Sequence, residues 1–324
     1  MRELPEGFSA RAPELGDAEE VAALISAGAL TGSGEANMTA EEVLDDWEDI
    51  DLDEEAVAVI SPGGRLAGYA DVVNRSFVAV SVYGYVHPEF RGRGVGSFLV
   101  AWGENWTRER IPRAAEEARI SVQHYIEGRD TGARSLLEDA EYAPVRATYV
   151  MEILLQEAPS VPDFPAGLTV RNFVPGRDEL AVFEAVEDAF RDVWNRPRGT
   201  FERFAGMTRG EVFDPALWFL AMDGGEIAGM ALAKVISGEG WVDVVGVRRA
   251  WRSRGLGLAL LRRAFGEYHR RGVEKVSLSV DAGSVTGAPR LYGRAGMHVA
   301  SEYLVYLKEL RPGVDLGERS GETE

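Results

Sequence analysis

One short turn occurs twice in this chain, and its residue types favour binding of an anion. RGRGVG covers residues 91–96 and RSRGLG covers residues 252–257, and the two align without a gap. Each turn stands between an apolar stretch and an amphipathic helical pattern. The first N–H groups of such a helix have no intrahelical partner, and the helix dipole adds partial positive charge there. We therefore expect a phosphate or pyrophosphate site at each turn.

The glycines and arginines of the turns have complementary roles in this prediction. Glycine removes the side chains that would hold a ligand away from the backbone, and arginine brings positive charge into the same few residues. The aligned residues are Arg91, Arg93, Gly94 and Gly96 in the first copy and Arg252, Arg254, Gly255 and Gly257 in the second. The alternative is that the glycines only make a tight turn. A second copy with matched arginines favours ligand binding.

Two other phosphate motifs do not fit these turns. A P-loop needs a lysine followed by a hydroxyl residue, and neither copy has them. A dinucleotide-binding fingerprint needs a third glycine or an alanine, where this chain has Leu99 and Leu260. Both turns also follow a β-meander rather than the first strand of a βαβ unit. Nucleotide binding of these two kinds is therefore not expected.

The same order of secondary structure is predicted before and after the proline-containing segment 154–167, which is typical of a linker. Each half is predicted as β-α-β-β-β-α-β-α-β, an α/β fold with a mixed sheet. Asp17 and Asp178 are predicted as the N-caps of the first helix in each half. The expected domains are residues 1–153 and 168–311, followed by a flexible tail at 312–324. Two similar halves indicate two tandem copies of one domain.

Composition excludes several classes of function. The chain has 324 residues, enough for two domains with their own cores. Its net charge of -18 argues against a nucleic-acid surface. It has no cysteine, so neither a disulfide nor a thiol nucleophile is possible. No apolar run is long enough to span a membrane, and no secretory signal is recognisable. We expect a cytoplasmic protein, a monomer or homodimer, without membrane or nucleic-acid partners.

The acidic segment EEVLDDWEDIDLDEE, residues 41–55, carries much of the negative charge. Such runs are usually solvated surfaces. The alternative is that it attracts a cationic acceptor such as an amine. The four histidines share no close spacing with carboxylates, so no metal site is expected.

The turns resemble the signature [RQ]-x-x-G-x-[GA] of the GNAT superfamily of acyl-CoA N-acyltransferases. A second family signature, A-x-x-L-Y-x-x-x-G-F, resembles Ala288 to Met297, which departs only at the last position. The corresponding segment of the first half, Ala133 to Tyr142, lacks both the tyrosine and the glycine. The resemblance covers nearly the whole chain, twice. It is specific for the family and uninformative about the acceptor.

This resemblance implies that acetyl-CoA or another acyl-CoA is the co-substrate and that no metal is involved. It implies that turn amides hold the pyrophosphate and that the preceding strand, splayed from its neighbour, pairs with the pantetheine arm. The acceptor would enter from the opposite face. The residues it assigns to the cofactor are Val245, Val247, Arg252, Arg254, Gly255, Leu256, Gly257 and Leu258 in the second half, and Val86, Arg91, Arg93, Gly94, Val95 and Gly96 in the first.

The resemblance also implies two proton carriers in the second half. Tyr292 matches the family tyrosine that reaches the thioester sulfur, so we expect it to act as general acid, unless it is a packed core tyrosine. Because side chains alternate between the two faces of a strand, Asp243 is expected on the same face as Val245 and Val247. We expect Asp243 to act as the base. A structural role for Asp243 is the alternative, with Glu239 as a weaker candidate base.

The first half lacks both carriers, because Val82 and Leu137 align with Asp243 and Tyr292. We expect it to bind coenzyme A or shape the acceptor cleft without rapid transfer. His124 is expected to be a structural, hydrogen-bonded residue.

The predicted function is direct N-acetyl transfer to a primary amine of a small molecule or peptide. The tandem organisation is similar to that of the mycothiol synthases, which acetylate a small pseudodisaccharide amine. Antibiotic, polyamine, amino-acid and peptide amines remain alternatives, as does a non-catalytic acyl-CoA sensor. Residues 188–204 and their counterpart in the first half are expected to set the acceptor. For Trp194 and Phe201 in this segment, core packing is favoured over a role in lining the acceptor pocket.

Overall fold

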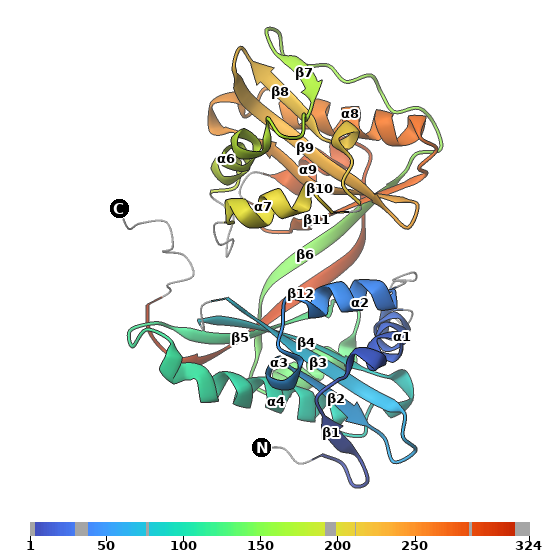
Figure 1. Cartoon of the computed structure of the whole chain (residues 1–324), viewed down its shortest axis with the longest axis vertical. Helices are drawn as coiled ribbons and strands as arrows, with labels where there is room; N and C mark the ends of the chain where they lie inside the picture. The colour runs from blue at the N-terminus through green and yellow to red at the C-terminus, as the bar shows by residue number, and fades with distance from the viewer. Residues whose placement is uncertain are drawn as a thin grey trace. The chain divides into compact units, whose positions relative to one another are not determined.

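The structure, a computed structural model, describes residues 4–29, 38–75, 78–191, 199–210, 212–284 and 287–314. The chain forms two compact units (Figure 1). Unit 1 contains the chain up to Ala147 and the described residues from Ser301 onward. Unit 2 contains Thr148–Ala300. The α/β fold and its mixed sheets are confirmed in both units.

Unit 1 has one mixed sheet with helices on both faces. Its elements are β1 (Ser9–Arg11), α1 (Ala18–Ala29), α2 (Ala40–Trp47), α3 (Leu52–Glu55), β2 (Ala56–Ile60), β3 (Leu66–Arg75), β4 (Ala79–Val86), α4 (Val95–Arg110), β5 (Ile120–Glu127), α5 (Thr131–Asp139) and most of β12 (His298–Arg311). The strand order is β1-β2-β3-β4-β5-β12, and only β4 and β5 run parallel.

Unit 2 repeats this arrangement. Its elements are most of β6 (Ala143–Leu154), β7 (Thr169–Asn172), α6 (Glu179–Ala189), α7 (Phe201–Met207), β8 (Phe219–Asp223), β9 (Glu226–Ile236), β10 (Glu239–Val247), α8 (Leu256–Arg270), β11 (Lys275–Asp281) and α9 (Ala288–Arg294). The order is β7-β8-β9-β10-β11-β6, and only β10 and β11 run parallel.

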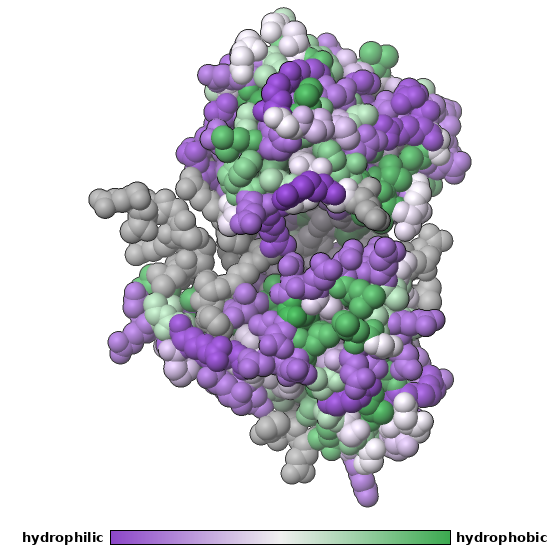
Figure 2. Space-filling model, viewed as in Figure 1, coloured by the Kyte–Doolittle hydropathy of each residue, from purple (hydrophilic) through white to green (hydrophobic). Residues whose placement is uncertain are grey.

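Alternation along the strands gives each sheet two apolar faces. In β2, Val57 and Val59 pack against α4, whereas Ala56 and Ala58 pack against α1 and α2. Unit 2 has an α8 cluster, which includes Leu256 and Phe265, and an α6–α7 cluster on the other face. Because helices cover both faces of the sheet, side chains that point to either face are buried. The surface in Figure 2 is correspondingly mixed, with hydrophilic side chains interrupted by small apolar areas.

Most of the last strand of each half belongs to the unit that the other half forms. From Thr148 to Leu154, β6 pairs with β11. From Tyr303 onward, β12 pairs with β5, and its Val305 and Tyr306 are buried in unit 1. The compact units therefore do not follow the expected limits of 1–153 and 168–311. Both strands run antiparallel to these partners, so strand pairing, not chain order, sets the boundary.

The two aspartates predicted as N-caps act differently. Asp17 accepts hydrogen bonds from the Glu14 amide and from Arg11. Asp178 precedes α6 but makes no side-chain cap; it accepts from Arg171, Arg177 and the Val174 amide instead. These ion pairs hold the pKa of each carboxyl below its usual range. Asp178 thus stands at the predicted N-cap position of α6 but does not cap it with its side chain, because nearby arginines bind the carboxylate. Asp17 directly precedes α1.

Candidate active site

The two glycine turns have the same backbone shape. Gly255 begins α8 with a φ of 83°, and Gly94 begins α4 with a φ of 90°. Two residues earlier, Ser253 and Gly92 also have positive φ, at 62° and 75°. Glycine adopts this left-handed conformation without strain. The positions of Gly94 and Gly255 therefore require glycine for the backbone itself.

The amides that follow these glycines have no intrahelical partner. The Ala259 amide is the first in α8 to make the helical bond, to the Gly255 carbonyl. Within the described chain, the amides of Leu256, Gly257 and Leu258 have no hydrogen-bond acceptor. In unit 1 the Phe98 amide likewise makes the first bond of α4, to the Gly94 carbonyl. Free N–H groups at a helix N-terminus suit an anion.

Gly96 and Gly257 have a packing role that the sequence did not indicate. A Cβ on Gly257 would lie 3.0 Å from Leu291 Cδ1 of α9, and one on Gly96 would lie 2.9 Å from Leu136 Cδ2 of α5. These glycines allow the two helices of each unit to pack closely. They place α9 against the start of α8 and α5 against the start of α4, and the expected approach of a ligand to these backbones stays a prediction.

The turn arginines also differ from one another. The Arg252 guanidinium donates to the Val247 carbonyl at 3.0 Å and to the Ala189 carbonyl at 2.9 Å, so it fastens the strand end to the end of α6. Arg91 lies 3.6 Å from Asp130, and Arg93 stacks on the Phe90 ring. Arg254 is exposed at the turn. Arg254 is therefore the better candidate for a phosphate contact in unit 2.

The strand before each turn separates from its parallel neighbour. β10 pairs with β11 at Gly240 and Trp241, and no pairing continues toward Val247. In unit 1, β4 pairs with β5 from Ala79 to Val82 only. This leaves the segments 242–247 and 83–86 with backbone groups on one edge that do not pair with β11 or β5. An extended ligand can pair with such an edge.

Asp243 lies where β10 leaves β11, at an irregularity of the strand. Val242 pairs with Ala233 and Val244 with Leu232, so Asp243 is the extra residue of a β-bulge. Period two does not continue through a bulge. Val242 and Val245 consequently belong to the α8 cluster, while Val244 packs in the α6–α7 cluster. The expected placement of Asp243 on the face of Val245 and Val247 therefore does not follow from alternation.

The surroundings of Asp243 favour a proton acceptor. Its carboxylate is one-fifth exposed and lies 3.1 Å from the Lys234 ammonium group. Burial raises the pKa of Asp243, while Lys234 and a hydrogen bond with Trp241 oppose that shift. A carboxylate whose pKa is raised is a stronger base than an exposed aspartate. Lys234 was not identified from the sequence.

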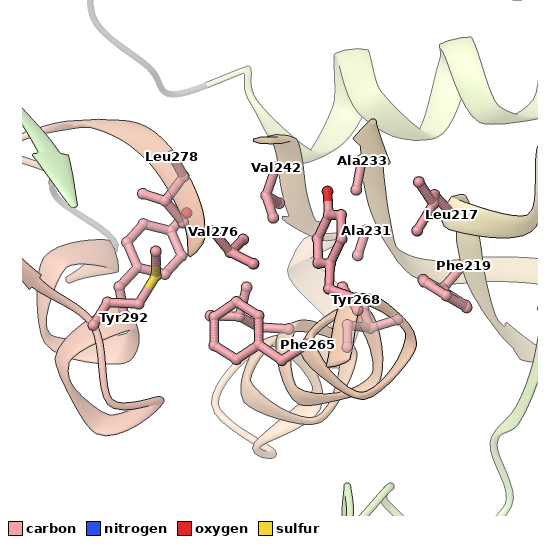
Figure 3. Packing of buried hydrophobic residues seen from close by; sticks show 14 of the residues in the cluster. Leu217, Phe219, Ala231, Ala233, Val242, Phe265, Tyr268, Val276, Leu278 and Tyr292 are labelled. Atoms are coloured by element: carbon pink, nitrogen blue, oxygen red, sulfur yellow. The ribbon is translucent and has the colours of Figure 1, made fainter. Parts of the chain in front are cut away.

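Tyr292 lies in α9 and packs into the α8 cluster (Figure 3). Only 8 % of it is exposed, and burial raises the pKa of Tyr292 to about 12. It therefore carries its proton at neutral pH, as a general acid must. Within the described residues its hydroxyl has no hydrogen-bond partner. Tyr268, a second tyrosine of this cluster, instead donates to the Lys234 or Trp241 carbonyl, at 2.8 and 2.9 Å.

Unit 1 has apolar core at the corresponding positions. Val82 and Leu137 are almost fully buried in the α4 cluster. His124 is buried beside Tyr142, and desolvation lowers the pKa of His124 to about 4 despite a hydrogen bond to the Val82 backbone. It is thus neutral at physiological pH and fixes the strand end where β4 leaves β5.

The segment proposed to select the acceptor is partly described. Trp194 lies outside the described residues. Phe201, in α7, is 42 % exposed and packs edge-on against Phe183 at 5.8 Å. Asp188 accepts from Arg248 at 2.9 Å. The described part of this segment therefore combines an aromatic surface with an ion pair.

Comparison with known proteins identifies the family. The model of the acetyltransferase (GNAT) family matches residues 29–125 and again residues 180–297. The chain therefore belongs to this family, as a tandem member, and is an acetyltransferase of the GNAT type.

Particular relatives extend this result. A mycothiol acetyltransferase of Thermobispora bispora is 32% identical over 218 residues, covering 65% of this chain and 70% of the relative. The crystal structure of a GCN5-related N-acetyltransferase from Sphaerobacter thermophilus is 53% identical, with a TM-score of 0.88, and the match covers 97% of this chain and 99% of that one. A tandem GNAT protein from the clavulanic acid biosynthesis pathway shares the fold at a TM-score of 0.74 and 16% identity, over 95% of this chain and 100% of that one.

Within the described residues, no group of three or more histidine or carboxylate side chains is arranged to hold a metal ion. No described helix combines the length and apolar character needed to cross a membrane.

Proposed function

We propose that unit 2 binds acetyl-CoA at the α8 turn and transfers the acetyl group directly to a primary amine of a small molecule or peptide. The observation that carries this proposal is the set of free amides at Leu256–Leu258, beside a strand edge that β11 leaves unpaired. Helix N-terminal amides bind the phosphates of nucleotide cofactors in this way. The edge from Val245 to Val247 would pair with the extended arm of the co-substrate.

The chemistry assigned to unit 2 uses two side chains. The amine nitrogen attacks the thioester carbon and loses a proton to Asp243, directly or through water. The carbon–sulfur bond breaks, and the departing thiolate takes a proton from the Tyr292 hydroxyl. The raised pKa values suit both roles. Asp243 becomes more basic, and Tyr292 keeps its proton until it donates to the departing thiolate.

The acceptor is proposed as a small-molecule amine, and the amine precursor of mycothiol is the first compound to test. Similarity to the mycothiol acetyltransferase supports this choice. An amine panel that also contains polyamines, amino acids and aminoglycosides, assayed by thiol release from acetyl-CoA, tests the activity. Tight binding of acetyl-CoA without turnover on any amine would instead support the alternative, an acyl-CoA sensor.

A matched pair of glycine substitutions tests which turn serves the reaction. Both Gly94→Val and Gly255→Val place a β-branched residue at positive φ, which costs about 1–2 kcal/mol of strain. We expect Gly255→Val to raise the KM for acetyl-CoA at least about tenfold, because that strain displaces the amides that bind the pyrophosphate. Gly94→Val should change it less than about threefold. If both variants fold and Gly94→Val raises the KM for acetyl-CoA more than Gly255→Val does, the reaction would be assigned to unit 1.

The pH dependence of kcat/KM tests the role of Asp243. A base works only when deprotonated, so activity should fall as the pH drops through its pKa. Because burial raises that pKa, the fall should begin at higher pH than for an exposed aspartate. In Asp243→Asn we expect kcat/KM to decrease about 100-fold or more and this acidic limb to disappear. An unchanged limb in the variant would assign the titration to another group.

A further inference from the structure

An ion pair between Lys234 of β9 and Asp243 of β10 lies where β10 leaves β11. The Lys234 ammonium group is 3.1 Å from Asp243 Oδ1, and only 27 % and 20 % of the two side chains are exposed. Lys234 is opposite Trp241 in the antiparallel register, and Asp243 is the extra residue of the bulge that follows. Two adjacent strands of one sheet therefore fix the distance between the charged groups.

The fold itself does not require this ion pair. Gly68 and Gly229 pair with the last residues of β4 and β10, and the same number of positions further along β3 and β9 stand Val73 and Lys234. A buried ion pair adds little stability, because desolvation of both groups offsets their attraction. The lysine in the unit to which the chemistry is assigned, against a valine in the other unit, therefore indicates a role in the site.

The charge of Lys234 opposes the effect of burial on Asp243. Burial raises the pKa of Asp243, and the positive charge of Lys234 lowers it more than the hydrogen bond with Trp241 does. Tyr268 of α8 lies near the same carboxylate. Burial, and to a smaller extent the charge of Asp243, raises the pKa of Tyr268, which therefore stays neutral. Among the described residues, Lys234 is thus the cation that acts on the titration of Asp243.

Charged groups on the neighbouring elements have partners of their own. On α6, Asp188 accepts from Arg248 at 2.9 Å. On β11, the Lys275 ammonium group lies 3.2 Å from the Glu239 carboxylate. The remaining contacts of α6 and α7 with the sheet come from the apolar α6–α7 cluster. The state of Asp243 therefore depends on burial and on Lys234.

These two opposing effects suit a carboxylate that accepts a proton. A base must be ionised before it can act, and a buried carboxyl without a nearby cation tends to keep its own proton. A cation within a few ångströms favours the ionised form and also holds the carboxylate in one orientation. Burial makes Asp243 more basic, and Lys234 keeps it ionised.

We propose that Lys234 is a positioning residue, which holds the Asp243 carboxylate ionised and oriented to take the proton of the acceptor amine. The proposal rests on the base role proposed above for Asp243. Lys234 acts through that carboxylate and not on the substrate. Loss of Lys234 therefore changes the pH dependence of the reaction, whereas loss of a residue that serves only the fold does not.

Carbon-13 NMR of the full chain with labelled aspartate tests the ion pair without any substrate. The signal that is missing in Asp243→Asn identifies Asp243, and its change with pH gives the midpoint of titration. In Lys234→Met, which keeps the aliphatic stem, the midpoint should move to higher pH by about 1–3 units, the usual effect of a neighbouring cation. Lys234→Arg keeps the charge and should leave the midpoint within about half a unit of the wild type.

The acidic limb of kcat/KM tests the role in the reaction, using the amine of the panel that gives the fastest thiol release. In Lys234→Met the limb should move with the NMR midpoint, and kcat/KM above the limb should fall about tenfold because the carboxylate loses its orientation. The KM for acetyl-CoA should change less than about twofold. In the Asp243→Asn background, adding Lys234→Met should change kcat/KM less than about twofold.

Lys275→Met is the matched control, because Lys275 forms a similar pair between adjacent strands of the same sheet. It should move the Asp243 midpoint and the kinetic limb by less than about half a unit. A limb that follows Lys275→Met and not Lys234→Met would make Glu239 the base and overturn the proposal. Thermal unfolding of each variant verifies the fold.

Two further results would overturn the proposal. One is an Asp243 midpoint that does not move in Lys234→Met. The other is an equal loss of kcat/KM on Lys234→Met with and without Asp243, which would show that Lys234 acts on the substrate directly. Failure of the proposed function looks different, because Asp243→Asn then keeps full activity while Lys234→Met still moves the Asp243 midpoint.

Discussion

Replacing Tyr292 with Phe is expected to lower the single-turnover rate of acetyl transfer by about 10²–10⁴-fold, the usual contribution of a general acid. The ring remains, so packing in the α8 cluster and the KM for acetyl-CoA should change little. The hydroxyl has no hydrogen-bond partner among the described residues, so the variant should unfold at nearly the wild-type temperature. Single-turnover thiol release and thermal unfolding measure the two effects separately.

Tyr268→Phe is the matched control, because Tyr268 lies in the same cluster (Figure 3). Its hydroxyl bonds backbone carbonyls of β9 and β10, so its loss should cost about 1–3 kcal/mol of stability and little of the rate. Opposite effects in the two variants would show that Tyr292 acts in chemistry. If both variants lose only stability, Tyr292 is a packed core residue.

The fragment 148–300 should fold, whereas the fragment 168–311 should not. The two have similar lengths, but only the first contains the part of β6 that pairs with β11. The second lacks the buried residues Met151 and Leu155 of the α8 cluster. Loss of each such side chain costs about 2–5 kcal/mol, and a domain has only about 5–15 kcal/mol in total. The second fragment also exposes β11 as an unpaired edge.

Circular dichroism and thermal unfolding of the two purified fragments measure this difference. We expect a cooperative transition for 148–300 and aggregation or a non-cooperative signal for 168–311. A cooperative transition of 168–311 at the temperature of 148–300 would show that β6 is dispensable to unit 2.

The sequence predicts the two-fold repetition and the turns well, because both rest on local patterns. Helical periodicity after Gly94 and Gly255 and alternation before them are strong signals. The pairing of β6 with β11 and of β12 with β5 has no such signal, since β6 and β12 have a similar mixture of apolar and charged residues. Local sequence specifies a strand more strongly than it specifies the neighbour with which that strand pairs.

In the candidate site, too, the features that depend on residues distant in the sequence could not be predicted. The roles of Gly96 and Gly257 depend on Leu136 and Leu291, which lie in helices further along the chain. The bulge at Asp243 changes which face its neighbours occupy, and nothing in the sequence WVDVVGV marks it.

A crystal structure of the full chain with coenzyme A bound tests the central claim most directly. We predict that oxygen atoms of the diphosphate lie within hydrogen-bonding distance of the Leu256, Gly257 and Leu258 nitrogen atoms, with the pantetheine arm along the 245–247 edge. Diphosphate density away from these nitrogen atoms, or at the α4 turn alone, would contradict the assignment of the reaction to unit 2.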